Sequence, residues 1–199
     1  MIAYGHALIT CDERSFEFVP SLQNIEKIGT PKEIVTTFKF LMSGGYTRQK
    51  FVKAIEVLEC CLVSDDDDLG FLYGFLTPSY HGDRILMMVG REPWQNAVIL
   101  ARHMLVHGIC GKSDKVDKSE AKACDEFKPS DYVNVARRVL ELSSEESKGL
   151  TMTELLILTK ESADAAEKED KERPPNIKEH NDQMDYLKRI NAARKETKR

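Results

Sequence analysis

The chain has 199 residues, a formal net charge of -4 and 41% hydrophobic residues. This length suits one domain, or one domain with an appendage. The acidic balance argues against a dedicated nucleic-acid binder. No apolar run approaches the roughly 20 residues that a membrane-spanning helix needs, and the N-terminus lacks the pattern of a secretory signal. We therefore expect a cytoplasmic protein that binds neither nucleic acid nor a membrane.

The first twenty residues predict a β-hairpin. Residues 2–10 are rich in strand formers, and Phe16 and Phe18 alternate with polar residues after a polar turn at 11–14. An isolated hairpin is marginal in water, so it must pack on other elements. The next part, residues 21–160, predicts a helical core domain. The expected fold is therefore mainly α (α+β), with an N-terminal hairpin at 1–20 followed by a helical bundle.

Helix-start signals recur along the core domain. Thr30 with Glu33, and Thr151 with Glu154, have the spacing of capping boxes, and Thr47 is a third N-cap. The predicted helices cover residues 21–28, 30–43, 47–62, 92–108, 129–140 and 151–160, with Gly108 as the C-cap of the fourth. The apolar runs at 69–76 and 85–89 do not distinguish strand from helix. Helical periodicity predicts that a set of apolar side chains is buried: Phe38, Phe51, Ile55, Leu58, Leu100 and Val139.

The last part, residues 161–199, predicts a charged and largely disordered extension. Residues 163–173 contain only alanine and charged residues, and Pro174 with Pro175 prevents the helix from continuing. Residues 182–195 have the spacing of a short amphipathic helix, which would be marginal alone. Residues 186–199 carry six basic residues and one acidic residue. We expect proteases to cut after Lys160, because this extension offers little apolar surface to bury.

The best metal-ligand candidates are His103, His107, Cys110 and Cys124, whose residue types suit zinc. Structural zinc sites usually place their ligands in tighter pairs, and no glutamate follows His103 as in the metalloprotease motif. Histidines near a helix C-terminus, where the helix dipole favours a cation, are the preferred interpretation. With five cysteines, an odd number that includes the adjacent Cys60 and Cys61, we also expect free thiols. No metal and no cofactor is predicted.

Other short motifs do not indicate an active site. The stretch from Gly108 to Ser113 is similar to the end of a phosphate-binding loop, but the motif's first glycine and its preceding strand are absent. The aspartates at 65–68 lack the offsets of a calcium loop, and no nucleophile elbow is present. We therefore predict a protein without catalytic residues.

One stretch resembles a known family. Leu140-Glu-Leu-Ser-Ser-Glu-Glu146, followed by Leu150-Thr-Met-Thr-Glu-Leu155, is similar to the break and helix start of tail assembly chaperones of long-tailed bacteriophages. The resemblance implies a small, mostly helical, non-enzymatic protein of the host cytoplasm. Its expected partner is the tape measure protein, which it keeps soluble during tail assembly, with the tail tube protein as a second candidate partner and self-association left open.

The chaperone interpretation assigns partner binding to the C-terminal third. Apolar contacts would set the lifetime of the complex, and basic residues would set the rate at which the two proteins associate. The expected partner-binding residues are Met152, Leu155, Leu156, Met184, Leu187, Ile190, Lys188 and Arg189. The helix that begins at 152 is equally consistent with a core element. Two other classes stay open: a structural virion protein, such as a minor tail or connector component, and a zinc-stabilised helical adaptor.

Overall fold

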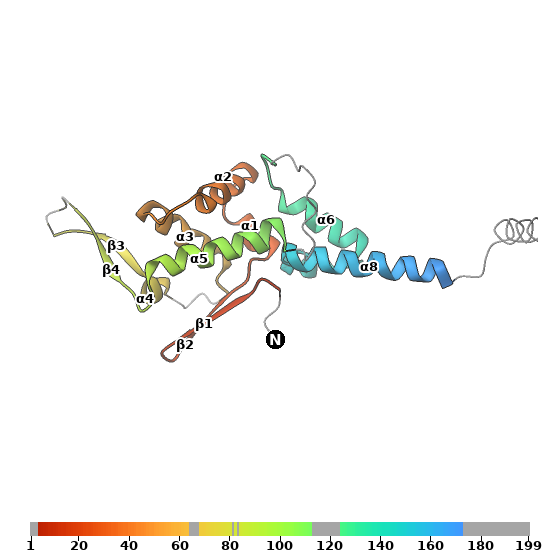
Figure 1. Cartoon of the computed structure of the whole chain (residues 1–199), viewed down its shortest axis with the longest axis horizontal. Coiled ribbons are helices and arrows are strands. Elements are labelled where there is room, and N and C mark those ends of the chain that lie inside the picture. The colour runs from red at the N-terminus through yellow and green to blue at the C-terminus, as the bar shows by residue number, and fades with distance from the viewer. Residues whose placement is uncertain (1–3, 64–67, 81, 83, 113–123, 173–199) are drawn as a thin grey trace, which may run out of the picture. The chain divides into compact units, whose positions relative to one another are not determined.

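A computed structural model describes residues 4–63, 68–80, 82, 84–112 and 124–172, with side-chain burial given as far as residue 164. The chain divides into two compact units, residues 1–160 and 161–199. The elements, in chain order (Figure 1), are β1 (Ala7–Cys11), β2 (Arg14–Phe18), α1 (Leu22–Glu26), α2 (Pro31–Met42), α3 (Arg48–Cys61), α4 (Leu69–Tyr73), β3 (Gly74–Pro78), β4 (Ile85–Val89), α5 (Trp94–Leu105), the π-helical turn η1 (Val106–Cys110), α6 (Pro129–Val139), α7 (Ser144–Gly149) and α8 (Met152–Glu172). The predicted α+β class with an N-terminal hairpin is confirmed.

Local capping explains where the helices begin. The Thr30 hydroxyl accepts a hydrogen bond from the Glu33 amide, and the Glu33 carboxylate accepts one from the Thr30 amide at 2.7 Å. Thr151 and Glu154 make the same reciprocal pair at the start of α8. Each pair satisfies backbone N–H groups that a helix N-terminus leaves unpaired. Both predicted capping boxes are therefore confirmed.

A third capping box was not predicted. Ser143 accepts from the Glu146 amide, and the Glu146 carboxylate accepts from the Ser143 amide at 2.9 Å. This pair starts α7, which occupies the stretch that the sequence analysis interpreted as a break between helices. The signal was present in the residues at 143–146 and follows the same spacing rule.

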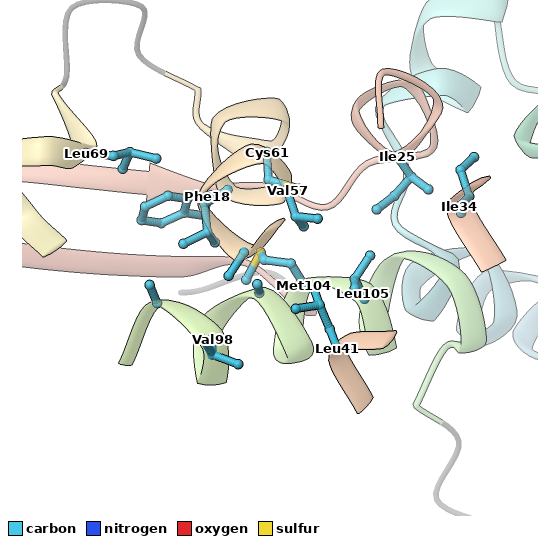
Figure 2. Close-up of a cluster of buried hydrophobic side chains, with 14 of the residues drawn as sticks. Phe18, Ile25, Ile34, Leu41, Val57, Cys61, Leu69, Val98, Met104 and Leu105 are labelled. Carbon is cyan, nitrogen blue, oxygen red and sulfur yellow. The ribbon is translucent and has the colours of Figure 1, made fainter. Parts of the chain in front are cut away.

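The hydrophobic core joins the hairpin to the helices of the first unit (Figure 2). Its members come from β2, from α1 to α6, from α8 and from Phe127 before α6. Those labelled in the close-up are Phe18, Ile25, Ile34, Leu41, Val57, Cys61, Leu69, Val98, Met104 and Leu105. Within this core Phe51 meets Trp94 edge to face, with ring centroids 5.9 Å apart. Burial of these side chains is the main favourable term in folding.

The predicted burial is confirmed for two of the six named side chains and is met in part by three others. Phe51 and Leu58 are buried, and three others, Phe38, Ile55 and Leu100, are partly buried against the core. The prediction for Val139 is wrong, because its side chain is 46% exposed. The buried stripe of α6 is centred on Ala136, and Val139 lies at the edge of this stripe in the last position of the helix.

The end of α5 also differs from the prediction. The chain does not stop at Gly108 but continues through η1 to Cys110, and Gly111, with φ of 68°, follows as the cap. Gly108 is buried, and a Cβ atom there would lie 2.6 Å from the Ile25 side chain. Close packing against α1, rather than helix termination, is what requires glycine at 108.

The C-terminal extension begins as helix. α8 runs from Met152 to Glu172, past the predicted end of the core domain at residue 160. Alanine, glutamate and lysine all have high intrinsic helix propensity, which the sequence analysis underweighted. The proline pair and the amphipathic stretch at 182–195 lie outside the described residues.

Candidate functional site

The second hairpin, β3–β4, carries a group of exposed large apolar side chains. β3 pairs antiparallel with β4, with Phe75 opposite Met88 and Thr77 opposite Leu86. Residues directly opposite one another in an antiparallel pair share a face. Phe75, Leu86 and Met88 therefore lie together on one face, and their side chains are 53%, 46% and 47% exposed. We call this face the apolar arm.

The opposite face of the same hairpin is only partly covered. Leu76 and Met87 lie opposite each other and pack against the core, whereas Ile85 and Val89 are 59% and 87% exposed. Figure 1 shows β3–β4 standing out from the helices of the first unit. The hairpin is thus held at one end by the core and offers large apolar side chains to the surroundings.

The base of the hairpin is tightly built. Gly74 has φ of 81°, and a Cβ atom there would lie 1.9 Å from the Met88 carbonyl oxygen. Two backbone hydrogen bonds, from Arg91 to Phe71 at 3.1 Å and from Glu92 to Leu72 at 2.7 Å, tie the chain after β4 to α4. Because only glycine tolerates this close approach with positive φ, the exposed arm has a defined base.

Such a surface is a candidate interaction site. Monomeric soluble proteins rarely expose contiguous apolar patches, and larger ones usually mark interaction sites. The sequence analysis left this region unassigned, although two apolar runs flanking the turn-forming residues at 78–84 are a hairpin signal. The signal was ambiguous because neither run alternates polar and apolar residues.

The predicted partner-binding residues are dispersed in the structure. Met152 and Leu155, at 7% and 3% exposure, belong to the core of the first unit, whereas Leu156 is 39% exposed. Leu156 lines a pocket of about 330 Å³ with Lys112 and Lys160. The remaining predicted contacts lie outside the described residues: Met184, Leu187, Lys188, Arg189 and Ile190.

The candidate metal ligands are not brought into one cluster. The His103 and His107 rings are 4.4 Å apart between centroids, and Cys110 and Cys124 are exposed. Over the described ranges, no group of three or more His, Cys, Asp or Glu side chains is arranged to hold a metal ion. All five cysteines are free thiols.

Both histidines have lowered pKa values. The His107 Nδ1 atom lies 2.9 Å from the Thr153 hydroxyl. Burial lowers the pKa of His107, and the charges of His103 and Lys112 lower it further. Burial, followed by Lys112, also lowers the pKa of His103. The His107–Thr153 contact therefore joins η1 to α8, and the lowered pKa values favour the neutral form of both rings.

Comparison with known proteins places the chain in one family. Residues 36–175 match a family of unknown function (DUF6246). The matched region runs from within α2 to beyond α8 and includes the apolar arm. No curated protein and no solved structure matches the chain. In the part of the chain that the structure describes, no helix is long and apolar enough to cross a membrane. Because the match covers well over half of the 199 residues, the chain belongs to this family of unknown function, DUF6246.

Proposed function

We propose that this protein is a non-enzymatic binding protein that keeps a partner chain soluble, and that it serves as a tail assembly chaperone of a long-tailed bacteriophage. Its client is then the tape measure protein. The observation that carries the proposal is the apolar arm, where Phe75, Leu86 and Met88 are all about half exposed on one face. The resemblance of residues 140–155 to such chaperones supplies the class.

The arm has the properties that a solubilising protein needs. Apolar surface on the arm takes the place of water around apolar segments of the client, and this transfer is favourable without directional contacts. The charged remainder of the chain, with 31% charged residues, keeps the complex in solution. A long helical client presents apolar stripes at i, i+3 and i+4 positions, which suit an apolar face of this kind.

The C-terminal residues form the second part of the proposal. Residues 174–199 carry the Met184, Leu187 and Ile190 positions together with the basic Lys188 and Arg189. In this proposal the basic residues speed encounter with the client, and the apolar ones prolong the complex. The core positions Met152 and Leu155 are then structural, and Leu156 is the exposed member of the set.

Co-expression with a tape measure protein of a long-tailed bacteriophage tests the proposal. The full chain should keep the client in the soluble fraction. The double variant Phe75→Ser, Met88→Ser should lose this effect while retaining its helical circular dichroism. Val52→Ser, Val135→Ser is the matched control, since these valines are 43% and 44% exposed elsewhere on the surface. Deletion of residues 174–199 should weaken the effect and spare folding.

Two outcomes would contradict the proposal. If the full chain neither binds the client nor keeps it soluble, the chaperone function is wrong. If the protein is found at a fixed stoichiometry in purified phage particles, the structural virion component becomes the better interpretation. A chaperone leaves the particle when assembly ends.

A further inference from the structure

A second surface of the first unit is a groove between β1 and α5. Two contacts define its ends. Gly5, just before β1, lies against His107, since a Cβ atom at Gly5 would be 2.6 Å from the His107 Cβ. Asp12, just after β1, forms an ion pair at 3.4 Å with Arg91, which precedes α5. β1 and α5 therefore run antiparallel, and the groove between them has a volume of about 500 Å³.

The lining of this groove is largely apolar. Ala7 and Ile9 line it from β1, and Ile99 and Leu100 line it from α5. The Ile99 side chain is 50% exposed, so it presents apolar surface at the groove. The lining also includes Tyr73 of α4, whose side chain is 1% exposed and whose hydroxyl has no hydrogen-bond partner among the described residues.

β1 is the outer strand at this groove. β2 pairs with β1 along one edge. Along its other edge, β2 and the residue after it contact the end of α3: the Val19 amide donates to the Cys61 carbonyl at 2.8 Å, and the Val63 amide donates to the Glu17 carbonyl at 2.9 Å. In an antiparallel pair, every second residue directs its N–H and C=O away from its partner strand. Within the described residues, no segment other than β2 makes backbone hydrogen bonds with Ala7–Cys11. The free edge of β1 is therefore open to a further strand.

The charge of the groove is acidic. Among the residues that line the groove, Glu92 is the carboxylate. It accepts a hydrogen bond from the Asn96 side chain at 3.0 Å. No cation forms an ion pair with Glu92 in the described part of the chain. At the other end His103 is neutral near pH 7, because burial and Lys112 lower its pKa. A ligand with a lysine or arginine near apolar residues complements this arrangement.

We propose that the β1–α5 groove binds an extended segment of a partner protein as an added β-strand. The segment pairs with the outer edge of β1, as in other cases where a peptide extends a sheet. Its alternate apolar side chains enter the groove against Ile9, Ile99 and Leu100, and a lysine or arginine reaches Glu92. β1 has five residues, so the paired segment is about five residues long. This surface is separate from the apolar arm, and the inference stands whether or not the protein is a chaperone.

The test uses the full ¹⁵N-labelled chain and a defined peptide probe, acetyl-Lys-Thr-Val-Thr-Val-Thr-amide, in which the lysine and both valines lie on the same face of an extended strand. We expect amide resonances of β1 and α5 to shift on titration, and hydrogen exchange of alternate β1 amides to slow. Ile99→Lys should weaken binding about tenfold or more, because it places a charge against apolar groups. Ile85→Lys is the matched control on the β3–β4 hairpin, on the face opposite the apolar arm, where Ile85 is 59% exposed, and it should leave the affinity unchanged.

Two further comparisons separate strand addition from simple apolar contact. A probe that is N-methylated at alternate residues cannot donate to the edge of β1, so it should bind about tenfold or more weakly. Glu92→Gln should weaken the lysine probe about threefold and leave a probe with glutamine in place of lysine unaffected. The proposal is overturned if the probe does not bind at millimolar concentration, if N-methylation has no effect, or if the shifts occur on β3–β4 instead.

Discussion

Lys50 and Arg102, from two different helices, donate hydrogen bonds to the same acceptor, the carbonyl oxygen of Ser43. Lys50 also donates to the Gly44 carbonyl at 2.8 Å, and Arg102 donates through Nε to that of Leu41 at 2.7 Å. These carbonyls belong to the end of α2, where a helix leaves its last C=O groups unpaired. Two cations, from α3 and α5, thus donate hydrogen bonds to carbonyls at and just after the C-terminus of α2. The Lys50 side chain is buried in this position.

Loss of the Lys50 ammonium should destabilise the fold. Lys50→Met keeps most of the side-chain volume but removes the charged donor from the Ser43 and Gly44 carbonyls, which we expect to lower the free energy of unfolding by about 1–3 kcal/mol. Urea denaturation followed by circular dichroism measures this change. Lys53→Met is the control, because Lys53 makes an ion pair with Glu56 on the surface and should change stability by less than about 1 kcal/mol. If the two variants lowered the free energy of unfolding equally, Lys50 would have no special role in capping the C-terminus of α2.

Phe51→Ala should be among the most damaging single changes in the core. Phe51 is 2% exposed and packs edge to face on Trp94. Its truncation leaves a cavity between α3 and α5, with an expected loss of about 3–5 kcal/mol in unfolding free energy. Val52→Ala, at a neighbouring exposed position, should cost within about 0.5 kcal/mol. A loss near zero for Phe51→Ala would mean that the described packing of α3 is wrong.

Gly108→Ala tests the close packing of η1 against α1. The new methyl group would lie 2.6 Å from the Ile25 side chain and 3.1 Å from the Pro20 carbonyl oxygen. We expect a loss of about 1–3 kcal/mol from overpacking. Gly44→Ala is the control, since a Cβ atom there meets nothing within 4 Å. If Gly108 were merely a surface helix cap, both alanine variants would show the same melting temperature.

Stability should fall as the pH decreases from 7 toward 5. The pKa of His107 and that of His103 are lowered in the folded chain, so below about 6.5 the unfolded chain binds protons that the folded chain does not. The stabilising contribution is therefore complete above the unfolded pKa and is lost as pH falls through the folded one. Thermal melts across this range measure the slope.

The variant His103→Gln, His107→Gln should fold and should show a shallower dependence on pH between 7 and 5. Glu33 and Glu146 do not interfere in this window. Hydrogen bonds from Thr30 and Ser143 lower the pKa values of these carboxyl groups from 4.5, so their effect appears at lower pH. An unchanged slope in the double variant would assign the pH dependence to other groups.

The features that could be predicted from the sequence are those decided by neighbours in the chain. The capping boxes at 30–33 and 151–154 need only residues three positions apart, and the N-terminal hairpin needs only alternation and a polar turn. The box at 143–146 obeys the same rule, so the sequence contains the signal for the start of α7 although this helix was not predicted. Among the predicted helices, the largest differences are at the ends of α5 and α8 rather than at their starts.

Tertiary structure decided the features that depend on distant residues. Whether the runs at 74–78 and 85–89 became strands depended on their pairing with each other, because short apolar runs satisfy either geometry. Gly108 was predicted to end a helix, yet its environment is set by Ile25, more than eighty residues earlier. Likewise the groove at Ile99 exists only because β1 lies beside α5. The sequence by itself determined the helices, their N-caps and the first hairpin, since local hydrogen bonds specify them, whereas the exposed arm and the groove arose only from packing between segments far apart in the chain.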